Sequence, residues 1–262
     1  APNRRDGRQN ALPPLVSPVH TIFKKLYAAY GPQRWWPAET PFEVMIGAIL
    51  TQSTAWANVE KSIVRLKSEN VLSPKKLNVL KARRLATLIT SSGYFNQKAK
   101  KIQSYLAYFL GAYAGSVSRM KAQRLESLRS ELLAVHGIGP ETADSILLYA
   151  LEKPIFVVDA YTRRIFTRLG FLKGDESYRQ VQDLFMKDLS RVDPRWSLHS
   201  AQAGCGDDSS GELTALYNEY HALVVHHGKH FCKKTRPLCG GCVLKEVCSF
   251  QRGPGDFRSS MT

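Results

Sequence analysis

Apolar residues recur along this chain with the period of an α-helix, and this pattern predicts helices almost throughout. After Trp56, for example, Val59, Ile63 and Leu66 follow at intervals of 3, 4 and 3 residues, so their side chains share one helix face. The alternation typical of strands is almost absent, and no internal repeat is visible. We therefore predict an all-α fold, with helices that include residues 16–30, 42–50, 100–113, 124–135, 160–169, 177–192 and 213–227.

The apolar segment at residues 42–50 is preceded by strong helix-start signals. Thr40 suits an N-cap, Pro41 suits the first helical position, and Glu43 suits the third position of a capping box. The segment is apolar nearly all round, so we expect this helix to be buried.

Two further helices meet at a tight turn within residues 132–151. The turn, Gly-Ile-Gly-Pro at 137–140, contains glycines that are free to take positive φ, and Pro154 ends the second helix. A short extended run at 155–158 then delivers Asp159 to the start of another helix. The backbone N–H groups of such a turn make a natural phosphate site, although a plain helix–helix connection has the same pattern.

The chain is strongly basic. Its 262 residues carry a net charge of +15, with a pI of about 9.7, which favours a polyanionic partner and first of all nucleic acid. Residues 1–13 read as a disordered basic tail without the apolar core of a secretory signal, and 251–262 read as a second tail. No apolar run approaches the roughly 18 residues of a membrane span. We expect an intracellular protein, in the cytoplasm or nucleoid, or in the nucleus of a eukaryote.

Four of the five cysteines gather within 17 residues, with the spacing C-x6-C-x2-C-x5-C. Four thiolates at this spacing can enclose one tetrahedral centre, and both zinc and a [4Fe–4S] cluster suit such a set. The pattern is unlike the disulfide framework of a secreted protein and favours a reducing compartment. The clustered residues are Cys232, Cys239, Cys242 and Cys248, whereas Cys205 lies apart in a predicted surface loop at 195–211.

The hairpin, Asp159 and the cysteine spacing together resemble the helix-hairpin-helix DNA glycosylases of the endonuclease III family. The resemblance implies a six-helix barrel domain at 42–153, with the hairpin at 132–151, and a cluster-bearing helical domain built from 14–41 and 154–250. It implies a structural [4Fe–4S] cluster, rather than zinc, on the four cysteines. We expect a monomer that binds double-stranded DNA containing a damaged base in the cleft between the domains.

Several residues match positions at which this family contacts DNA. By that resemblance, Gly137 and Gly139 of the hairpin meet the DNA backbone, and so does Lys98. Gln52 matches the residue that fills the gap left by a flipped base. Tyr94, or else the aromatic residue after it, matches the side chain that wedges into the base stack.

The chemistry expected of the family depends on one carboxylate. Breaking an N-glycosidic bond develops positive charge on the sugar, which a buried carboxylate beside C1′ stabilises. Asp159 matches the catalytic aspartate, although an Asp at a helix start is also a favoured cap. Family members that also cut the strand have a Lys two residues after the second glycine, and its amine attacks C1′. Here that position is Glu141, so we expect a monofunctional glycosylase whose lyase activity is absent or weak.

The segment Trp35-Trp36-Pro37 resembles the base pocket of the 3-methyladenine DNA glycosylases of the endonuclease III type. In those proteins an aromatic platform stacks the extruded base, and cationic alkylated purines are attracted to π faces. The resemblance therefore favours an alkylated purine as substrate. Adenine-removing members carry a catalytic Glu where this chain has Gly47-Ala48, which weakens that alternative.

Two other functions stay open. One is a bifunctional glycosylase and AP lyase that acts on oxidised pyrimidines through another Lys. The other is a catalytically silent protein that binds damaged DNA through the hairpin and the basic surface. The sequence does not decide the preferred lesion, a redox role of the cluster, or the roles of Cys205 and the N-terminal tail.

Overall fold

The computed structural model describes residues 18–190 and 209–252. The predicted N-terminal tail, most of the C-terminal tail and the loop segment that contains Cys205 lie outside these ranges. Every regular element within the described ranges is helical, which confirms the predicted all-α fold. In the same ranges, no helix combines the length and the apolar content that crossing a bilayer requires.

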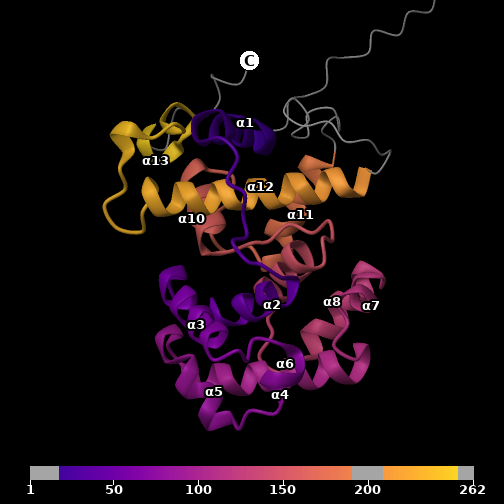
Figure 1. The fold of residues 1–262 in the computed structure, drawn as a ribbon. Coiled ribbons are helices and arrows are strands. Elements are labelled where there is room, and N and C mark those ends of the chain that lie inside the picture. Colours follow the sequence, from indigo (N-terminus) through magenta and orange to yellow (C-terminus); the bar gives the residue numbers. More distant parts are fainter. Residues whose placement is uncertain (1–17, 191–208, 253–262) are drawn as a thin grey trace, which may run out of the picture.

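The described elements follow one another along the chain as helices and helical turns (Figure 1). Their bounds are α1 Pro18–Tyr30, α2 Pro41–Leu50, α3 Trp56–Ser68, α4 Pro74–Asn78, α5 Ala82–Leu88, η1 Thr90–Ser92, α6 Phe95–Tyr113, α7 Val117–Lys121, α8 Leu125–Ala134, α9 Pro140–Ser145, η2 Ile146–Ala150, α10 Ala160–Leu169, α11 Tyr178–Leu189, α12 Ser209–His230, η4 Cys239–Gly241, η5 Lys245–Val247 and α13 Ser249–Arg252.

Figure 1 shows the helices in two groups, with α2 to α8 in one and α1 and α10 to α13 in the other. Although α1 comes first in the sequence, it packs against α11 and α12. Helix α10 packs against α12 and α13 in the same group. Helix α2 contacts α3, α6, α9 and η2, so it lies against the hairpin. The exact domain boundaries at 42–153, 14–41 and 154–250 stay a prediction.

Helix α2 starts where the sequence signals place it, but its capping bonds differ from the expected box. Thr40 caps the helix, and its Oγ1 accepts a hydrogen bond from the Glu43 backbone N–H at 3.2 Å. The Glu43 carboxylate accepts from the backbone N–H of Glu39 instead of that of Thr40, and it forms an ion pair with Lys67 Nζ at 2.8 Å. The reciprocal half of the capping box is therefore replaced by an ion pair with α3.

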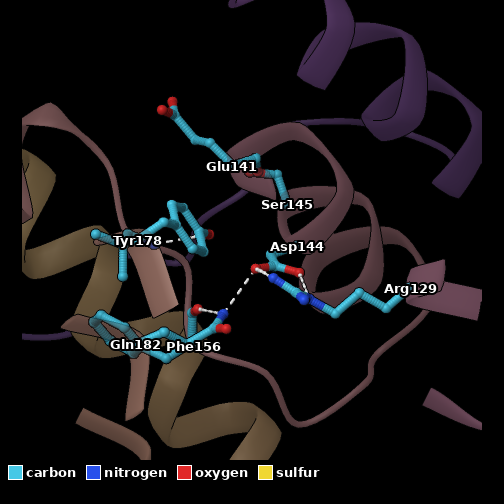
Figure 2. Close-up of polar contacts among 8 residues, drawn as sticks. Arg129, Glu141, Asp144, Ser145, Phe156, Tyr178 and Gln182 are labelled. Carbon is cyan, nitrogen blue, oxygen red and sulfur yellow. Dashed lines mark hydrogen bonds and ion pairs between the residues drawn. The ribbon is translucent and has the colours of Figure 1, made fainter. Parts of the chain in front are cut away.

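A buried polar network fixes the hairpin to the segment that leads to Asp159 (Figure 2). Asp144 of α9 is fully buried, and its carboxylate accepts from Arg129 Nε of α8 at 2.7 Å. Gln182 of α11 donates from Nε2 to Asp144 Oδ2 at 2.7 Å and to the Phe156 carbonyl at 2.6 Å. A buried charge is tolerated only when it is paired and hydrogen-bonded, so this network sets the position of the extended run at 155–158 relative to the hairpin.

Candidate active site

A cavity of about 640 Å³ opens beside the hairpin. Its walls come from the loop before α2, the end of α2 and start of α3, the hairpin turn, the start of α10, and α12. The cavity brings together most of the predicted site residues, namely Trp35, Trp36, Gln52, Gly137, Gly139, Glu141 and Asp159.

Asp159 is both the cap of α10 and a wall of this cavity. Its Oδ1 accepts from the Thr162 backbone N–H at 2.7 Å and from the Thr162 hydroxyl at 2.9 Å, while the residue is only 9% exposed. Desolvation by itself would raise the pKa of Asp159. The contact with the His221 imidazole and the two bonds from Thr162 outweigh it, so the pKa of this carboxyl is lowered. The cavity therefore holds a carboxylate that stays ionised.

His221 is a cavity residue that the sequence reasoning missed. Its ring comes from α12, and Nε2 lies 3.5 Å from Asp159 Oδ2. Its Nδ1 is hydrogen-bonded to the Tyr149 hydroxyl of η2. The only signal in the sequence is a lone histidine within an apolar stretch of helix, and such a histidine is more often a core residue.

Glu141 stands in the first turn of α9, at the mouth of the same cavity. Its side chain points away from the Arg129–Asp144 network, as Figure 2 shows. Desolvation raises the pKa of the Glu141 carboxyl, the Asp159 charge raises it further, and His221 acts in the opposite direction. The two carboxyls therefore have pKa values that are shifted apart, which is typical of acid and base pairs in active sites.

The two tryptophans before α2 form an aromatic wall together with Trp56. The Trp36 ring lies 5.1 Å from Trp56 and 5.2 Å from Tyr149, between centroids. A Cβ at Gly47 would lie 3.3 Å from Trp36 Cζ2, so glycine lets this ring lie close to α2. Trp35 also contacts Trp56, at 5.5 Å between centroids.

Pro37 does not line the main cavity. It lines a separate, smaller pocket with Trp36 and α3. Its predicted contact with an extruded base therefore has no support from its position.

Gln52 joins the end of α2 to the hairpin. Its Nε2 donates to the Gly137 carbonyl at 3.0 Å and to Thr142 Oγ1 at 2.9 Å, and its Oε1 accepts from Lys101. Gly137 has a φ of +82°, and a Cβ there would come within 2.4 Å of Lys101 Cγ. Both the backbone conformation and the close packing of Lys101 thus require glycine at this position.

Tyr94 is 67% exposed at the N-cap of α6, and its role as a wedge stays a prediction. Lys98 is placed differently from the prediction. It is 2% exposed, and its ammonium donates to the carbonyls of Leu50 at 2.8 Å and of Ser92 at 2.6 Å. A phosphate cannot reach a buried ammonium that is already held by two acceptors, so Lys98 is corrected from a DNA contact to a structural residue.

The HhH-GPD superfamily, described as base excision DNA repair proteins, has a sequence pattern that matches residues 46–191, which is more than half of the 262 residues. The chain belongs to this superfamily. Among its relatives within the superfamily, a Methanocaldococcus jannaschii protein named "Putative DNA repair glycosylase" is 40% identical over 88% of this chain and 95% of that protein. Endonuclease III of Thermotoga maritima is 30% identical over 84% of this chain and 88% of its own length.

Solved structures of the HhH-GPD superfamily have the same fold. The H. pylori 3-methyladenine DNA glycosylase MagIII, bound to 1,N6-ethenoadenine, matches with a TM-score of 0.70 and 29% identity, over 80% of this chain and 97% of that one. A non-covalent Endonuclease III–DNA complex also matches with a TM-score of 0.70, at 22% identity, over 89% of this chain and 95% of that one. The second likeness concerns the fold alone. These matches confirm the resemblance drawn from the hairpin and the cysteines.

The cysteine loop lies beyond the segment that the HhH-GPD pattern matches. A second, mostly apolar cavity is lined by all four clustered cysteines, together with Arg168 and His227. Desolvation raises the pKa of the Cys242 thiol, and the three other cysteines act on it in the same direction. In the described part of the chain, no three His, Cys, Asp or Glu side chains approach closely enough to hold one metal ion.

Two arginines of α10 hold this loop. Arg164 donates to the Cys232 carbonyl at 2.9 Å and to the Gly228 carbonyl at 3.0 Å. Arg168 donates to Cys232 Sγ at 3.3 Å and to the Lys233 carbonyl at 2.7 Å. Because Asp159 caps the start of α10, one helix connects the candidate catalytic carboxylate to the cysteine loop.

Proposed function

We propose that this protein flips a damaged base out of double-stranded DNA and hydrolyses its N-glycosidic bond, as a monofunctional glycosylase. The observation that carries this proposal is Asp159, an ionised and buried carboxylate in the wall of a cavity of about 640 Å³. A base must leave the helical stack before an enzyme can act on it in such a cavity. The net charge of +15 supports binding to DNA, and a DNA substrate puts the activity inside the cell.

Asp159 would act on the sugar. As the C1′–N bond breaks, positive charge develops at C1′, and the carboxylate stabilises it. Thr162 already holds Oδ1, so Oδ2 is the oxygen available to the sugar and to an incoming water. The cap thus orients the catalytic group, and the two roles of Asp159 are compatible.

An alkylated purine is the substrate that the cavity walls support best. Trp35, Trp36 and Trp56 offer π faces on one side of the cavity. Stacking on aromatic side chains stabilises an extruded base by about 1–3 kcal/mol. The likeness to MagIII, whose structure contains 1,N6-ethenoadenine, supports the same class of substrate.

A bifunctional enzyme is the second candidate, because two lysines line the cavity although residue 141 is a glutamate. The Lys101 ammonium is bonded to Gln52, and Lys229 Nζ lies 5.8 Å from the centroid of the Trp35 ring. Neither therefore has an ammonium free of other contacts. Borohydride trapping on DNA with an abasic site or an oxidised pyrimidine separates the two candidates, since only an amine that forms a Schiff base leaves a covalent adduct.

The test of the main proposal is single-turnover excision on duplexes that each carry one lesion, with Asp159→Asn as the matched variant. The panel contains 3-methyladenine, 1,N6-ethenoadenine, hypoxanthine, uracil and an oxidised pyrimidine. Because asparagine keeps the shape and much of the capping ability, we expect DNA binding to persist while base release falls about a hundredfold or more. A parent protein that binds damaged duplexes but releases no base from the panel would instead be a silent damaged-DNA-binding protein.

We further propose that Cys232, Cys239, Cys242 and Cys248 hold a [4Fe–4S] cluster, which would cross-link the loop without taking part in the bond cleavage. Two observations support this cluster. The four cysteines line one cavity, and Arg164 and Arg168 hold the loop through hydrogen bonds to Cys232. Anaerobic purification followed by iron, sulfide and zinc analysis tests the proposal. We expect about four irons per chain, unchanged in Cys205→Ser. Stoichiometric zinc without iron would refute the cluster.

A further inference from the structure

His221 has a nitrogen that the fold leaves without a partner. The residue is 6% exposed, yet its ring lines the cavity that contains Asp159. Among the described residues, Nε2 makes no hydrogen bond, because its contact with Asp159 Oδ2 at 3.5 Å is too long to count as one. Buried polar atoms nearly always have a partner, so an unpartnered nitrogen in a ring that lines a ligand cavity points to a partner that arrives with the ligand.

The hydrogen bond with the Tyr149 hydroxyl influences which ring nitrogen of His221 carries a hydrogen. In a neutral imidazole the hydroxyl can donate to Nδ1, which leaves the hydrogen on Nε2. In a protonated imidazole Nδ1–H donates to the hydroxyl oxygen instead, and Nε2 again carries a hydrogen. In both of these arrangements Nε2 carries a hydrogen, whereas a neutral ring with its hydrogen on Nδ1 leaves Nε2 bare.

We propose that His221 is the proton donor to the departing base, and that it extends the substrate range to neutral modified bases such as 1,N6-ethenoadenine. The proposal rests on the glycosylase function proposed above and names the class of leaving group. A cationic purine, methylated at N3 or N7, departs as a neutral molecule and needs no proton. A neutral base departs as an anion unless a ring nitrogen is protonated, and for this class a general acid matters most.

The step balances in protons and electrons. Protonated His221 transfers its Nε2 proton to a ring nitrogen of the base, and the C1′–N electron pair leaves with the base. Asp159 remains a carboxylate and stabilises the positive sugar. The oxygen of a water then bonds to C1′, and the proton that this water loses returns to Nε2 of the neutral His221.

A cation in the cavity wall favours the same class of substrate. Lys229 lies 5.8 Å from the centroid of the Trp35 ring, so one aromatic surface of the wall already has a positive charge beside it. The positive charge of Lys229 would repel a cationic purine stacked on this tryptophan, whereas it would not repel a neutral base.

The test compares two substrates in one variant. His221→Gln keeps a polar side chain but cannot deliver a proton, so we expect excision of 1,N6-ethenoadenine to fall about a hundredfold. Excision of 3-methyladenine should fall by a clearly smaller factor, which reports the lost contact between His221 and Asp159, so the ratio of the two rates is the measured quantity. Binding of the variant to damaged duplex DNA shows that it is folded. Tyr149→Phe removes the hydroxyl that is bonded to Nδ1. It should also lower the excision rate of 1,N6-ethenoadenine relative to that of 3-methyladenine, by a smaller factor than His221→Gln. His226→Gln on the same helix is the matched control, because His226 does not line the cavity.

Three outcomes would overturn the proposal while leaving the glycosylase function intact. One is an equal loss on both substrates, which would mean that His221 acts only through Asp159 or the fold. Another is no loss on either substrate. The third is a parent enzyme that releases only cationic purines. Failure of the parent to release any base would refute the proposed function itself.

Discussion

At the scale of single residues, the candidate site depends on how Asp159 is held. The Thr162 backbone and hydroxyl fix Oδ1, while Oδ2 faces the His221 imidazole. The lowered pKa of Asp159 follows from these contacts. A carboxylate with fixed orientation and fixed charge needs no reorganisation when the sugar becomes positive, which is the main source of electrostatic catalysis.

The neighbouring position 141 offers a gain-of-function test. Glu141→Lys would restore an amine at the position where strand-cleaving relatives carry their nucleophile, and the residue lines the cavity within reach of the Asp159 charge. We expect this variant to form borohydride-trappable adducts with DNA containing an abasic site, because an amine beside C1′ forms a Schiff base. The measurement is a gel shift of labelled DNA after reduction.

Glu141→Gln is the control for this variant, since it removes the charge without adding an amine. It should give no trapped adduct. If Glu141→Lys releases bases normally but traps no DNA, the hairpin does not bring residue 141 to C1′. If the parent already traps DNA, the monofunctional assignment is wrong.

The residues that the sequence predicted well are those whose role is local. Asp159 follows an extended run and starts a helix, and Gly137 sits in a hairpin turn, so neighbouring residues identify both. His221 and Lys98 depend on contacts between distant segments. His221 lines the cavity only because α12 packs against η2 and α10, and Lys98 is buried only because α2 ends above it. No local pattern contains that information.

At the scale of elements, Lys98 fastens the end of α2 to η1 through its bonds to the Leu50 and Ser92 carbonyls. Burial, and secondly the charge of Lys101, lower the pKa of the Lys98 ammonium from 10.5 to about 8. Between these two pH values the unfolded chain binds more protons than the folded one. The free energy of unfolding contributed by this group therefore rises with pH in that window.

This linkage predicts that the free energies of unfolding of the parent and of Lys98→Met differ by an amount that depends on pH. Below about pH 8 the folded protein keeps a desolvated charge, so this group contributes least there. We expect the parent to gain stability over the variant as pH rises from about 8 to about 10, measured by urea unfolding at several pH values. Lys100→Met, at an exposed lysine of the same helix, is the matched control. If the difference in free energy of unfolding between the parent and Lys98→Met stays constant or falls as pH rises, the lowered pKa of Lys98 is contradicted.

Helix α10 joins two sites, since Asp159 caps its start and Arg168 near its end grips the cysteine loop. Arg168→Lys keeps the charge but loses the planar fork that reaches Cys232, Lys233 and Lys234 together. If the loop holds the proposed cluster, this variant should lose iron and visible absorbance faster in air than the parent. Arg163 lies on the same helix and donates to the Glu176 carbonyl, so Arg163→Lys should match the parent. Equal rates in all three proteins would show that Arg168 does not hold the loop.

Most helices were predictable because the periodic spacing of apolar residues and the capping residues at helix starts are local features of the sequence. The start of α2 is an example, with Thr40 as its cap. Its second capping bond was not predictable, because Glu43 is drawn toward Lys67 of α3, a partner that only the packed structure supplies. The sequence predicts the second hairpin helix, but not that it continues from α9 into a π-helical turn, η2, which the apolar pattern does not reveal.

At the scale of the whole molecule, the chain returns on itself, with α1 packed among the C-terminal helices (Figure 1). The all-α class follows from the sequence pattern. The packing of α1 against the C-terminal helices does not, because the sequence of residues 18–30 shows an apolar face but not which helices that face contacts. The Asp144 network then links the two helix groups beside the cavity. The cavity is therefore a property of the assembled fold rather than of any one segment.

The net charge of +15 is also a property of the whole chain, and it predicts how DNA binding responds to salt. Each phosphate neutralised by a Lys or Arg releases counterions, so log K falls with log salt at a slope of about −0.9 per contact. With about five contacts we expect a slope of about −4.5 or steeper on duplex DNA. Asp159→Asn is the protein to titrate, because slow base release allows equilibrium to be reached. Replacing Lys233 and Lys234 by alanine should reduce the slope by about 1.8 if both meet phosphates. A parental affinity that is the same at low and high salt would mean that the basic surface does not bind the DNA backbone.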